Sequence, residues 1–187
     1  MRETMGLLSP VLREWRIGKV LGWLRGERIL DCGCGSGSLL DAIGKEKHYV
    51  GIDVNKGCID GRQARKGAKF LLMDVERDKL RIGKFDTIVA CALIEHLTNP
   101  SEFISKISRL LNKNGRILIT TPTSKADIIL NLGSSIGIFD RGAYEEHKVY
   151  WDYEDFRRVA QELGLRIEHY ERFQLGLNQL VILSRTA

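Results

Sequence analysis

A glycine-rich turn constrains this chain more than any other feature of its sequence. The segment Asp31-Cys32-Gly33-Cys34-Gly35-Ser36-Gly37 has glycine at every second position from residue 33. It joins a predicted strand, residues 28–31, to a predicted helix, residues 38–45. Glycine permits a sharp turn and lets a ligand approach the backbone with no Cβ in the way. In open α/β sheets such a turn lies at the carboxyl edge, where ligands bind, and the helix start offers N–H groups that can receive a carboxylate.

Strands and helices alternate through the first 120 residues. The pattern predicts strands at residues 28–31, 48–54, 68–75, 85–91 and 116–121, and helices at 38–45, 56–66 and 100–111. Two further strands, 165–173 and 179–185, are joined by a connection too short for a parallel crossover, which needs about a dozen residues. The expected fold class is therefore α/β, a doubly wound and mostly parallel sheet with helices on both faces and an antiparallel C-terminal strand.

Three further segments complete the predicted organisation. An amphipathic helix is expected at about residues 9–24, and a helix capped by Asp152 at residues 152–163. Residues 123–150 show no clean period and are interpreted as a variable insertion. With 187 residues and no repeat or linker-like boundary, the chain is expected to form a single domain, 1–187. The apolar side of the first helix is predicted to consist of Val11, Leu12, Trp15, Val20, Leu21 and Leu24.

Composition bears on the location of the protein and on its possible metal and nucleic acid partners. The sequence has no run of 18 apolar residues and no signal-peptide pattern, so a cytoplasmic location without a membrane span is expected. The four cysteines lack zinc-ribbon spacing and are expected to be reduced, with no metal site. The formal charge of +5 is spread along the chain, which permits a nucleic acid partner without favouring one. No pattern in the sequence predicts the oligomeric state.

The acid that precedes the first glycine separates this turn from a dinucleotide fingerprint. Gly33 and Gly35 fit the pattern G-x-G-x-x-G, but its last position is Ser38. A carboxylate at Asp31 would repel a pyrophosphate. It suits instead a ligand that carries an ammonium and a sulfonium, as S-adenosylmethionine does.

Two more acids follow predicted strands. Asp53 ends the second strand 20 residues after Gly33, where an acid can accept both ribose hydroxyls of an adenosine. Asp74 ends the third strand and could accept from the adenine amine, or could cap a turn. Val54 and Val75, which come directly after these acids, would sandwich the adenine ring. Three strand-end acids that suit one ligand favour an adenosyl cofactor.

Together these motifs resemble the class I S-adenosylmethionine-dependent methyltransferases, and more narrowly their type 11 group of small-molecule enzymes. The resemblance covers roughly residues 28–187 and implies a seven-stranded, Rossmann-like sheet with S-adenosyl-L-methionine as cofactor. The matching segments are residues 31–37, 51–54, 73–75, 85–91, 94–97 and 110–121. The cofactor-binding residues are predicted to be Asp31, Gly33, Cys34, Gly35, Gly37, Asp53, Val54, Asp74, Val75, Cys91 and His96. The chain departs from many relatives at Ala92, where they carry an acid or a polar residue.

Methyl transfer from a sulfonium needs a general base only when the acceptor is a weak acid such as a hydroxyl. The candidate bases are His96, Glu95 and His147. Glu95 and His96 follow the fourth predicted strand and could instead begin a helix. In similar enzymes the stretch around His147 borders the acceptor pocket, which is expected to combine residues 123–151 with the N-terminal helix. Trp15 and Trp23 on that helix would cover the cofactor or, in the case of Trp15, pack in the core.

The sequence is compatible with four functions. The first is a methyltransferase acting on a small molecule. The second is a methyltransferase acting on RNA or protein, although Cys91-Ala92-Leu93-Ile94 replaces the Asn-Pro-Pro-Tyr type of tetrad used to methylate base amines. The third is a non-catalytic subunit that binds S-adenosylmethionine. The fourth, a nicotinamide dehydrogenase, is disfavoured by Asp31 and by the terminal hairpin. The acceptor and its methylated atom are not encoded in any motif that the sequence presents.

Overall fold

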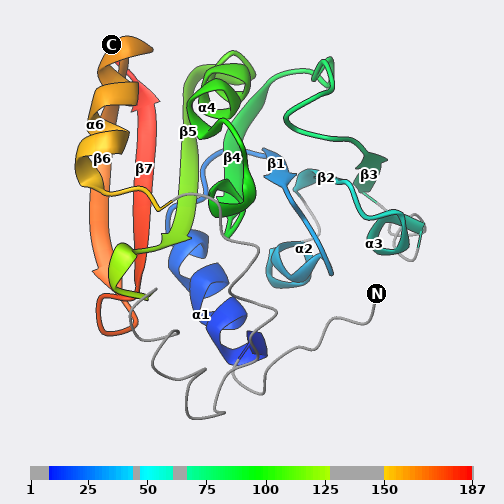
Figure 1. Ribbon diagram of the computed structural model, residues 1–187. Coiled ribbons are helices and arrows are strands. Elements are labelled where there is room, and N and C mark those ends of the chain that lie inside the picture. The colour runs from blue at the N-terminus through cyan, green and yellow to red at the C-terminus, as the bar shows by residue number, and fades with distance from the viewer. Residues whose placement is uncertain (1–8, 44–46, 61–66, 127–149, 187) are drawn as a thin grey trace.

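The computed structural model describes residues 9–43, 47–60, 67–126 and 150–186, shown as a ribbon in Figure 1. The strands are β1 (Arg28–Cys32), β2 (His48–Asp53), β3 (Ala68–Leu72), β4 (Phe85–Cys91), β5 (Leu111–Pro122), β6 (Leu165–Phe173) and β7 (Asn178–Arg185). The helices are α1 (Ser9–Leu21), α2 (Ser38–Ala42), α3 (Lys56–Asp60), the short 3-10 helix η1 (Ile94–His96), α4 (Pro100–Ser108) and α6 (Tyr153–Glu162). Among the helices of these ranges, none is both long and apolar enough to cross a membrane.

The strands form a seven-stranded sheet in the order β3-β2-β1-β4-β5-β7-β6. All neighbouring pairs from β3 to β5 are parallel, whereas β7 runs antiparallel to both β5 and β6. This arrangement confirms the predicted fold class, including the antiparallel C-terminal strand. The strand order reverses between β1 and β4, and the crevice at such a reversal is where open α/β sheets bind ligands.

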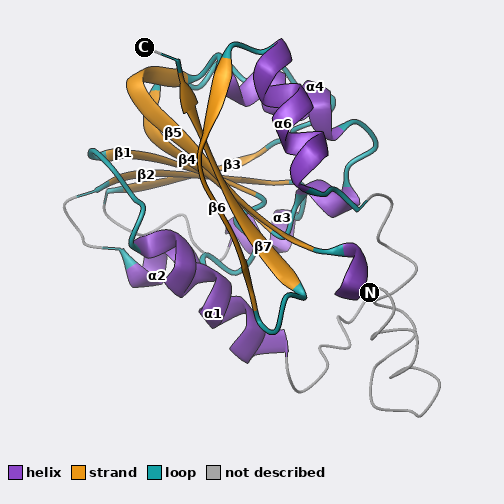
Figure 2. Ribbon diagram, turned by 90° about the vertical axis from the view of Figure 1, so that its left-hand side faces the viewer, coloured by secondary structure: helices purple, strands orange, loops and turns teal. Residues whose placement is uncertain are grey.

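Helices cover both faces of the sheet, as Figure 2 shows with α1 and α2 on one side and α4 and α6 on the other. Neighbouring residues of a strand point to opposite faces. In β1, accordingly, Ile29 packs with Ile17 and Val20 of α1, whereas Leu30 belongs to the cluster built on α4 and α6. Burial on both faces explains why the central strands are almost continuously apolar.

Two element boundaries differ from prediction for a local reason. Residues 112–115 resemble a helix stop, but they lie within β5, which already pairs with β4 at Leu111 and Phe85. The register then shifts, and pairing resumes between Arg116 and Thr87, so the extra residues form a bulge. Helix α4 accordingly ends at Ser108. The predicted cap of α6 is confirmed, because Asp152 accepts from the N–H groups of the first helical turn in a capping box.

The predicted apolar side of α1 is partly wrong. Val11 and Trp15 are 59% and 52% exposed, whereas Ile17 and Val20 are buried against the sheet. Trp15 therefore does not belong to the core. Trp23 lies after α1 and stacks on His169 of β6 at a centroid distance of 4.5 Å, away from the glycine-rich turn. Leu21 and Leu24, also predicted on this side, are partly buried against the same cluster, so the prediction is wrong at the exposed residues Val11 and Trp15.

The connection into β1 leads to a testable prediction about stability. Gly26 has φ of +63°, and a Cβ built there would lie 2.4 Å from the side chain of Asp86. Asp86 Oδ2 accepts from the N–H groups of Glu27 and Arg28, which begin β1, at 3.0 and 3.1 Å. Gly26→Ala must adopt a left-handed backbone and displace this carboxylate. We expect it to lower the free energy of unfolding by about 2–3 kcal/mol, as measured by urea denaturation.

Gly22→Ala is the matched control, because a Cβ at residue 22 meets no heavy atom within 4 Å. That variant should unfold within about 1 kcal/mol of the wild type. Equal stability of the two variants would show that Asp86 does not tie β1 to β4 in the way described.

Candidate functional site

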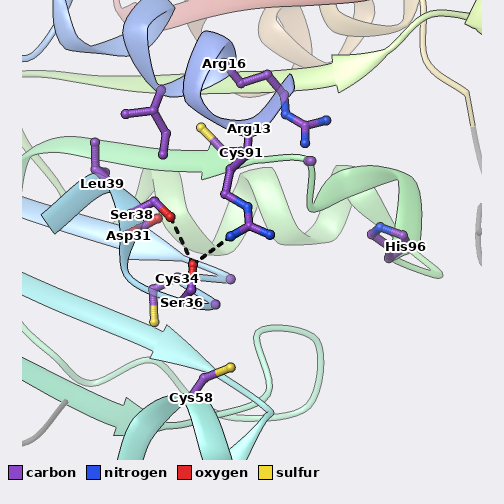
Figure 3. A pocket seen from close by; sticks show the side chains of 14 residues that line it. Arg13, Arg16, Asp31, Cys34, Ser36, Ser38, Leu39, Cys58, Cys91 and His96 are labelled. Atoms are coloured by element: carbon purple, nitrogen blue, oxygen red, sulfur yellow. Dashed lines mark hydrogen bonds between the residues drawn. The ribbon is translucent and has the colours of Figure 1, made fainter. Parts of the chain in front are cut away.

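A cavity of about 440 Å³ lies at the carboxyl edge of the sheet, where β1 and β4 diverge. Figure 3 shows that its walls come from α1, the glycine-rich turn, α3, and the segment from the end of β4 to η1. The lining residues are Arg13, Arg16, Ile17, Asp31, Gly33, Cys34, Gly35, Ser36, Ser38, Leu39, Cys58, Cys91, Ala92 and His96. The sequence-predicted residues Asp31, Gly33, Cys34, Gly35, Cys91 and His96 are thus brought together around one pocket.

The glycine-rich turn is held in shape by its own backbone. Gly33 has φ of +70°, and the N–H groups of Gly33 and Cys34 both donate to the carbonyl of Ile52 at 2.8 and 3.1 Å. The N–H of Gly35 donates to Asp53 Oδ2 at 2.8 Å, and that of Gly37 donates to the carbonyl of Cys34. These donors are occupied within the protein. An anionic ligand group must therefore find its main partner elsewhere in the pocket.

Asp31 places a buried carboxyl group in the pocket wall. Its side chain is 4% exposed, and Oδ2 accepts a hydrogen bond of 2.6 Å from the hydroxyl of Tyr49. Burial raises the pKa of Asp31 from its usual 3.8 to about 7; the Tyr49 hydroxyl acts in the opposite direction, and nearby Asp53 adds to the increase. A cation that entered the pocket would favour the ionised form and would find a partner already in place.

Asp53 stands at the end of β2 and supports the turn. Besides accepting from Gly35, its carboxylate accepts from the N–H of Asn55 at 2.8 Å. Both oxygens keep lone pairs for ligand hydroxyls. The next residue, Val54, is 66% exposed and offers an open apolar surface beside this carboxylate. Asp53, Val54 and Gly37 do not line the cavity itself.

The two residues predicted to bind the adenine after β3 have partners within the protein. Asp74 accepts from the N–H groups of Glu76 and Arg77 at 2.8 and 3.3 Å, which is the turn-capping role of a strand-end aspartate. Val75 is 5% exposed and belongs to the core. Of the two valines expected to sandwich the adenine ring, only Val54 is exposed to solvent. Neither Asp74 nor Val75 lines the cavity.

The segment after β4 forms the far side of the pocket. Burial raises the pKa of the Cys91 thiol to about 12, so this sulfur stays protonated and is a poor nucleophile. Ala92 has φ of +50°, a strained conformation fixed by its N–H bond to the carbonyl of Thr120. Glu95 is 2% exposed and accepts from the Thr121 hydroxyl at 3.0 Å, which leaves His96 as the titratable side chain of η1 in the pocket wall. His147 lies outside the described residues.

Two arginines of α1 belong to the site and were missed by sequence reasoning. Arg13 donates to the hydroxyl of Ser36 at 2.9 Å, and both Arg13 and Arg16 point into the pocket in Figure 3. Their spacing of three residues places them on one side of the helix. That spacing was the available signal, but only the buried contacts of Ile17 and Val20 fix which side faces the pocket.

Comparisons with known proteins agree with this geometry. A family model described as a methyltransferase domain matches residues 16–170. A ubiquinone biosynthesis O-methyltransferase of Aeromonas salmonicida is 26% identical over 91% of this chain and 79% of its own length. The corresponding enzyme of Coxiella burnetii is 29% identical over 64% of this chain, and the chain spans about half, 53%, of that relative.

Solved structures of low sequence identity share the fold. Magnesium protoporphyrin IX methyltransferase from Synechocystis, with bound S-adenosylhomocysteine (SAH), superposes with a TM-score of 0.73 at 18% identity, covering 100% of this chain and 90% of its own. A TehB-like S-adenosylmethionine-dependent methyltransferase from Corynebacterium glutamicum gives a TM-score of 0.67 at 20% identity, covering 95% and 97%.

Proposed function

Because the chain belongs to the family of methyltransferase domains, we propose that it transfers the methyl group of S-adenosylmethionine to an oxygen atom of a small-molecule acceptor. The family match confirms the predicted class I methyltransferase and its cofactor. The observation that carries the proposal is the buried carboxyl of Asp31 beside the glycine-rich turn, in a pocket at the reversal of strand order. The relatives named ubiquinone biosynthesis O-methyltransferase support a small acceptor and transfer to oxygen.

The residues present suit the cofactor. Asp31 would accept from its ammonium, and the guanidinium of Arg13, at the rim of the turn, would bind its carboxylate. Asp53 would accept from the ribose hydroxyls, and Val54 would cover the adenine ring. Residue 33 must be glycine for this turn, because its φ is +70° and a Cβ there would lie 3.0 Å from the side chain of Leu93. When bound, the cofactor supplies an electrophilic methyl group on a positively charged sulfur.

The protein contributes position rather than a covalent nucleophile. Orientation of the acceptor oxygen can supply about 7–11 kcal/mol of the barrier to an in-line displacement. Ile17 of α1 and Leu39 of α2 line the pocket and restrict water on one side. An acceptor hydroxyl must lose its proton, and the imidazole of His96 in the pocket wall can hold it. His147 stays a candidate base for the same step.

Ligand binding tests the proposal first. Isothermal titration calorimetry should detect binding of SAH, because the pocket offers a partner for each of its charged groups. NAD should not bind, because Asp31 would repel its pyrophosphate. Preferential binding of NAD would overturn the cofactor assignment.

Transfer of the methyl group tests the acceptor. Wild-type protein supplied with a methyl-labelled donor should label catechols or phenols in a metabolite panel and leave total RNA and protein unlabelled. Labelled RNA or protein would replace the small-molecule acceptor with a macromolecular one. Binding of SAH with no labelling of any class would favour a non-catalytic subunit.

A further inference from the structure

The pocket contains two guanidinium groups, whereas the cofactor carries one carboxylate. Arg13 and Arg16 both line it from α1. Their contacts with the rest of the pocket wall differ. Arg13 donates to Ser36, in the glycine-rich turn, and so lies where the methionine part of the cofactor is expected. The electrostatic neighbours of Arg16 are Glu95 and Cys91, after and at the end of β4, together with Arg13 one helical turn away.

Among the residues that the structure describes, Arg16 has no close partner for its charge. Within the described part of the chain its guanidinium makes no hydrogen bond and no ion pair within 4.0 Å. The nearby acid Glu95 is turned toward Thr121, to which its carboxyl group is hydrogen-bonded. The guanidinium of Arg16 is held partly away from water, and this burial lowers its pKa. A partly buried guanidinium whose N–H donors are unsatisfied destabilises the fold, but it can bind an anion.

The position of Arg16 points to the methyl acceptor. The turn that would hold the methionine part follows β1, and the transferable methyl must face the loops after β4 and β5. Arg16 stands on that side of the pocket, above Cys91 in Figure 3. A single guanidinium close to the acid Glu95 matches one negative charge better than the two of a phosphate.

We propose that Arg16 binds a carboxylate of the methyl acceptor, so that the enzyme selects small acidic acceptors over their neutral counterparts. The inference rests on the proposed function. It makes Arg16 a specificity-determining residue that contacts the acceptor and leaves the cofactor to Arg13, Asp31 and the turn. The planar fork of arginine can donate two parallel hydrogen bonds to a carboxylate, which lysine cannot reproduce.

The test compares acids with their esters. Protein saturated with SAH is titrated with benzoate and 3,4-dihydroxybenzoate and with the methyl ester of each, with saturation-transfer NMR used to detect weak binding. We expect each acid to bind the wild type about tenfold more tightly than its ester, the difference that charge-assisted hydrogen bonds supply. In Arg16→Met the preference should vanish, and in Arg16→Lys it should be reduced. SAH affinity should stay within about twofold of the wild type in both variants.

Two further variants separate the alternatives. Arg157→Met removes the same charge from the exposed surface of α6 and should keep the full preference. Arg13→Met should weaken SAH binding instead. Equal binding of acids and esters by the wild type, or failure of both acids to bind at millimolar concentration, would overturn the proposal. So would an Arg16→Met variant that loses SAH affinity and keeps the preference, because Arg16 would then be a cofactor ligand. Failure of the wild type to bind SAH would instead refute the proposed function.

Discussion

Replacement of Asp31 by asparagine is expected to weaken SAH binding by at least about 100-fold at pH 8. The proposed partner of Asp31 is an ammonium group that is removed from water when the cofactor binds. Asparagine has nearly the same shape but carries no charge, so the ammonium would be buried without compensation. Loss of one member of a buried ion pair typically costs about 3–5 kcal/mol. Calorimetric titration of the two proteins with SAH measures the effect directly.

The pH dependence of binding identifies the group responsible. Burial raises the pKa of Asp31 to about 7, so in the free protein this carboxyl is mostly protonated below neutral pH. It must release its proton to accept a cation. The wild-type affinity for SAH should therefore rise with pH up to about 7, by close to tenfold per pH unit on the acidic side, and level off above it. Asp31→Asn should remove this dependence.

Tyr49→Phe is the matched control for the titration. The Tyr49 hydroxyl donates to Asp31 at 2.6 Å and acts to lower the pKa of the carboxyl group. Without that hydroxyl the rise in affinity should remain but move to higher pH. A flat profile in the wild type, or an unchanged midpoint in Tyr49→Phe, would show that Asp31 does not receive the cation.

The stability of Asp31→Asn shows whether weak SAH binding comes from the lost contact or from unfolding. Asp31 has a higher pKa in the folded protein than its usual 3.8, so the folded state holds this proton more tightly than the unfolded state. Its contribution therefore makes the ligand-free protein less stable as pH rises from about 4 to about 7. Asp31→Asn should not show this decrease and should be at least as stable as the wild type at pH 8. Weak SAH binding by such a protein reports the missing charge.

The sequence predicted the parts of the site that depend on neighbouring residues. The glycine-rich turn and Asp31 lie within seven consecutive residues, and their conformation follows from glycine spacing between a strand and a helix. The run of Ile and Val in β4 is apolar because both of its faces are buried. For these elements, local pattern and tertiary position agree.

Features that depend on contacts between residues far apart in the sequence were not predicted. The orientation of α1 is set by Ile17 and Val20 packing on the sheet, and without it Arg13 and Arg16 look like surface charges. The bulge in β5 depends on Gly115, where a Cβ would lie 2.9 Å from the carbonyl of Phe85. The core position of Val75 follows from where β3 ends. Each of these is a contact between segments far apart in the chain, which periodicity does not encode.

The second large effect is expected at the end of β2. Asp53→Ala should weaken SAH binding about 100-fold, whereas Asp74→Ala should weaken it by no more than about tenfold. Asp53 has two tasks, because it is proposed to accept both ribose hydroxyls and it also holds the N–H of Gly35 in the turn. For Asp74 the sequence predicts only one contact, to the adenine amine, and its carboxylate already caps the turn at Glu76 and Arg77. Calorimetry with SAH on both variants measures the difference.

A deoxy analogue of the ligand separates the two tasks of Asp53. The wild type should bind SAH more tightly than its 2′-deoxy counterpart, because one hydroxyl has been removed. In Asp53→Ala this difference in affinity should largely disappear. The affinity lost because Gly35 is no longer held by residue 53 should be the same for both ligands. The four binding free energies, of two proteins with two ligands, form a double-mutant cycle. Their nonadditive part measures the contact between Asp53 and the ribose. Should Asp74→Ala lose as much affinity as Asp53→Ala, or should the deoxy penalty persist in Asp53→Ala, the carboxylate at residue 53 would support the turn without binding the ribose.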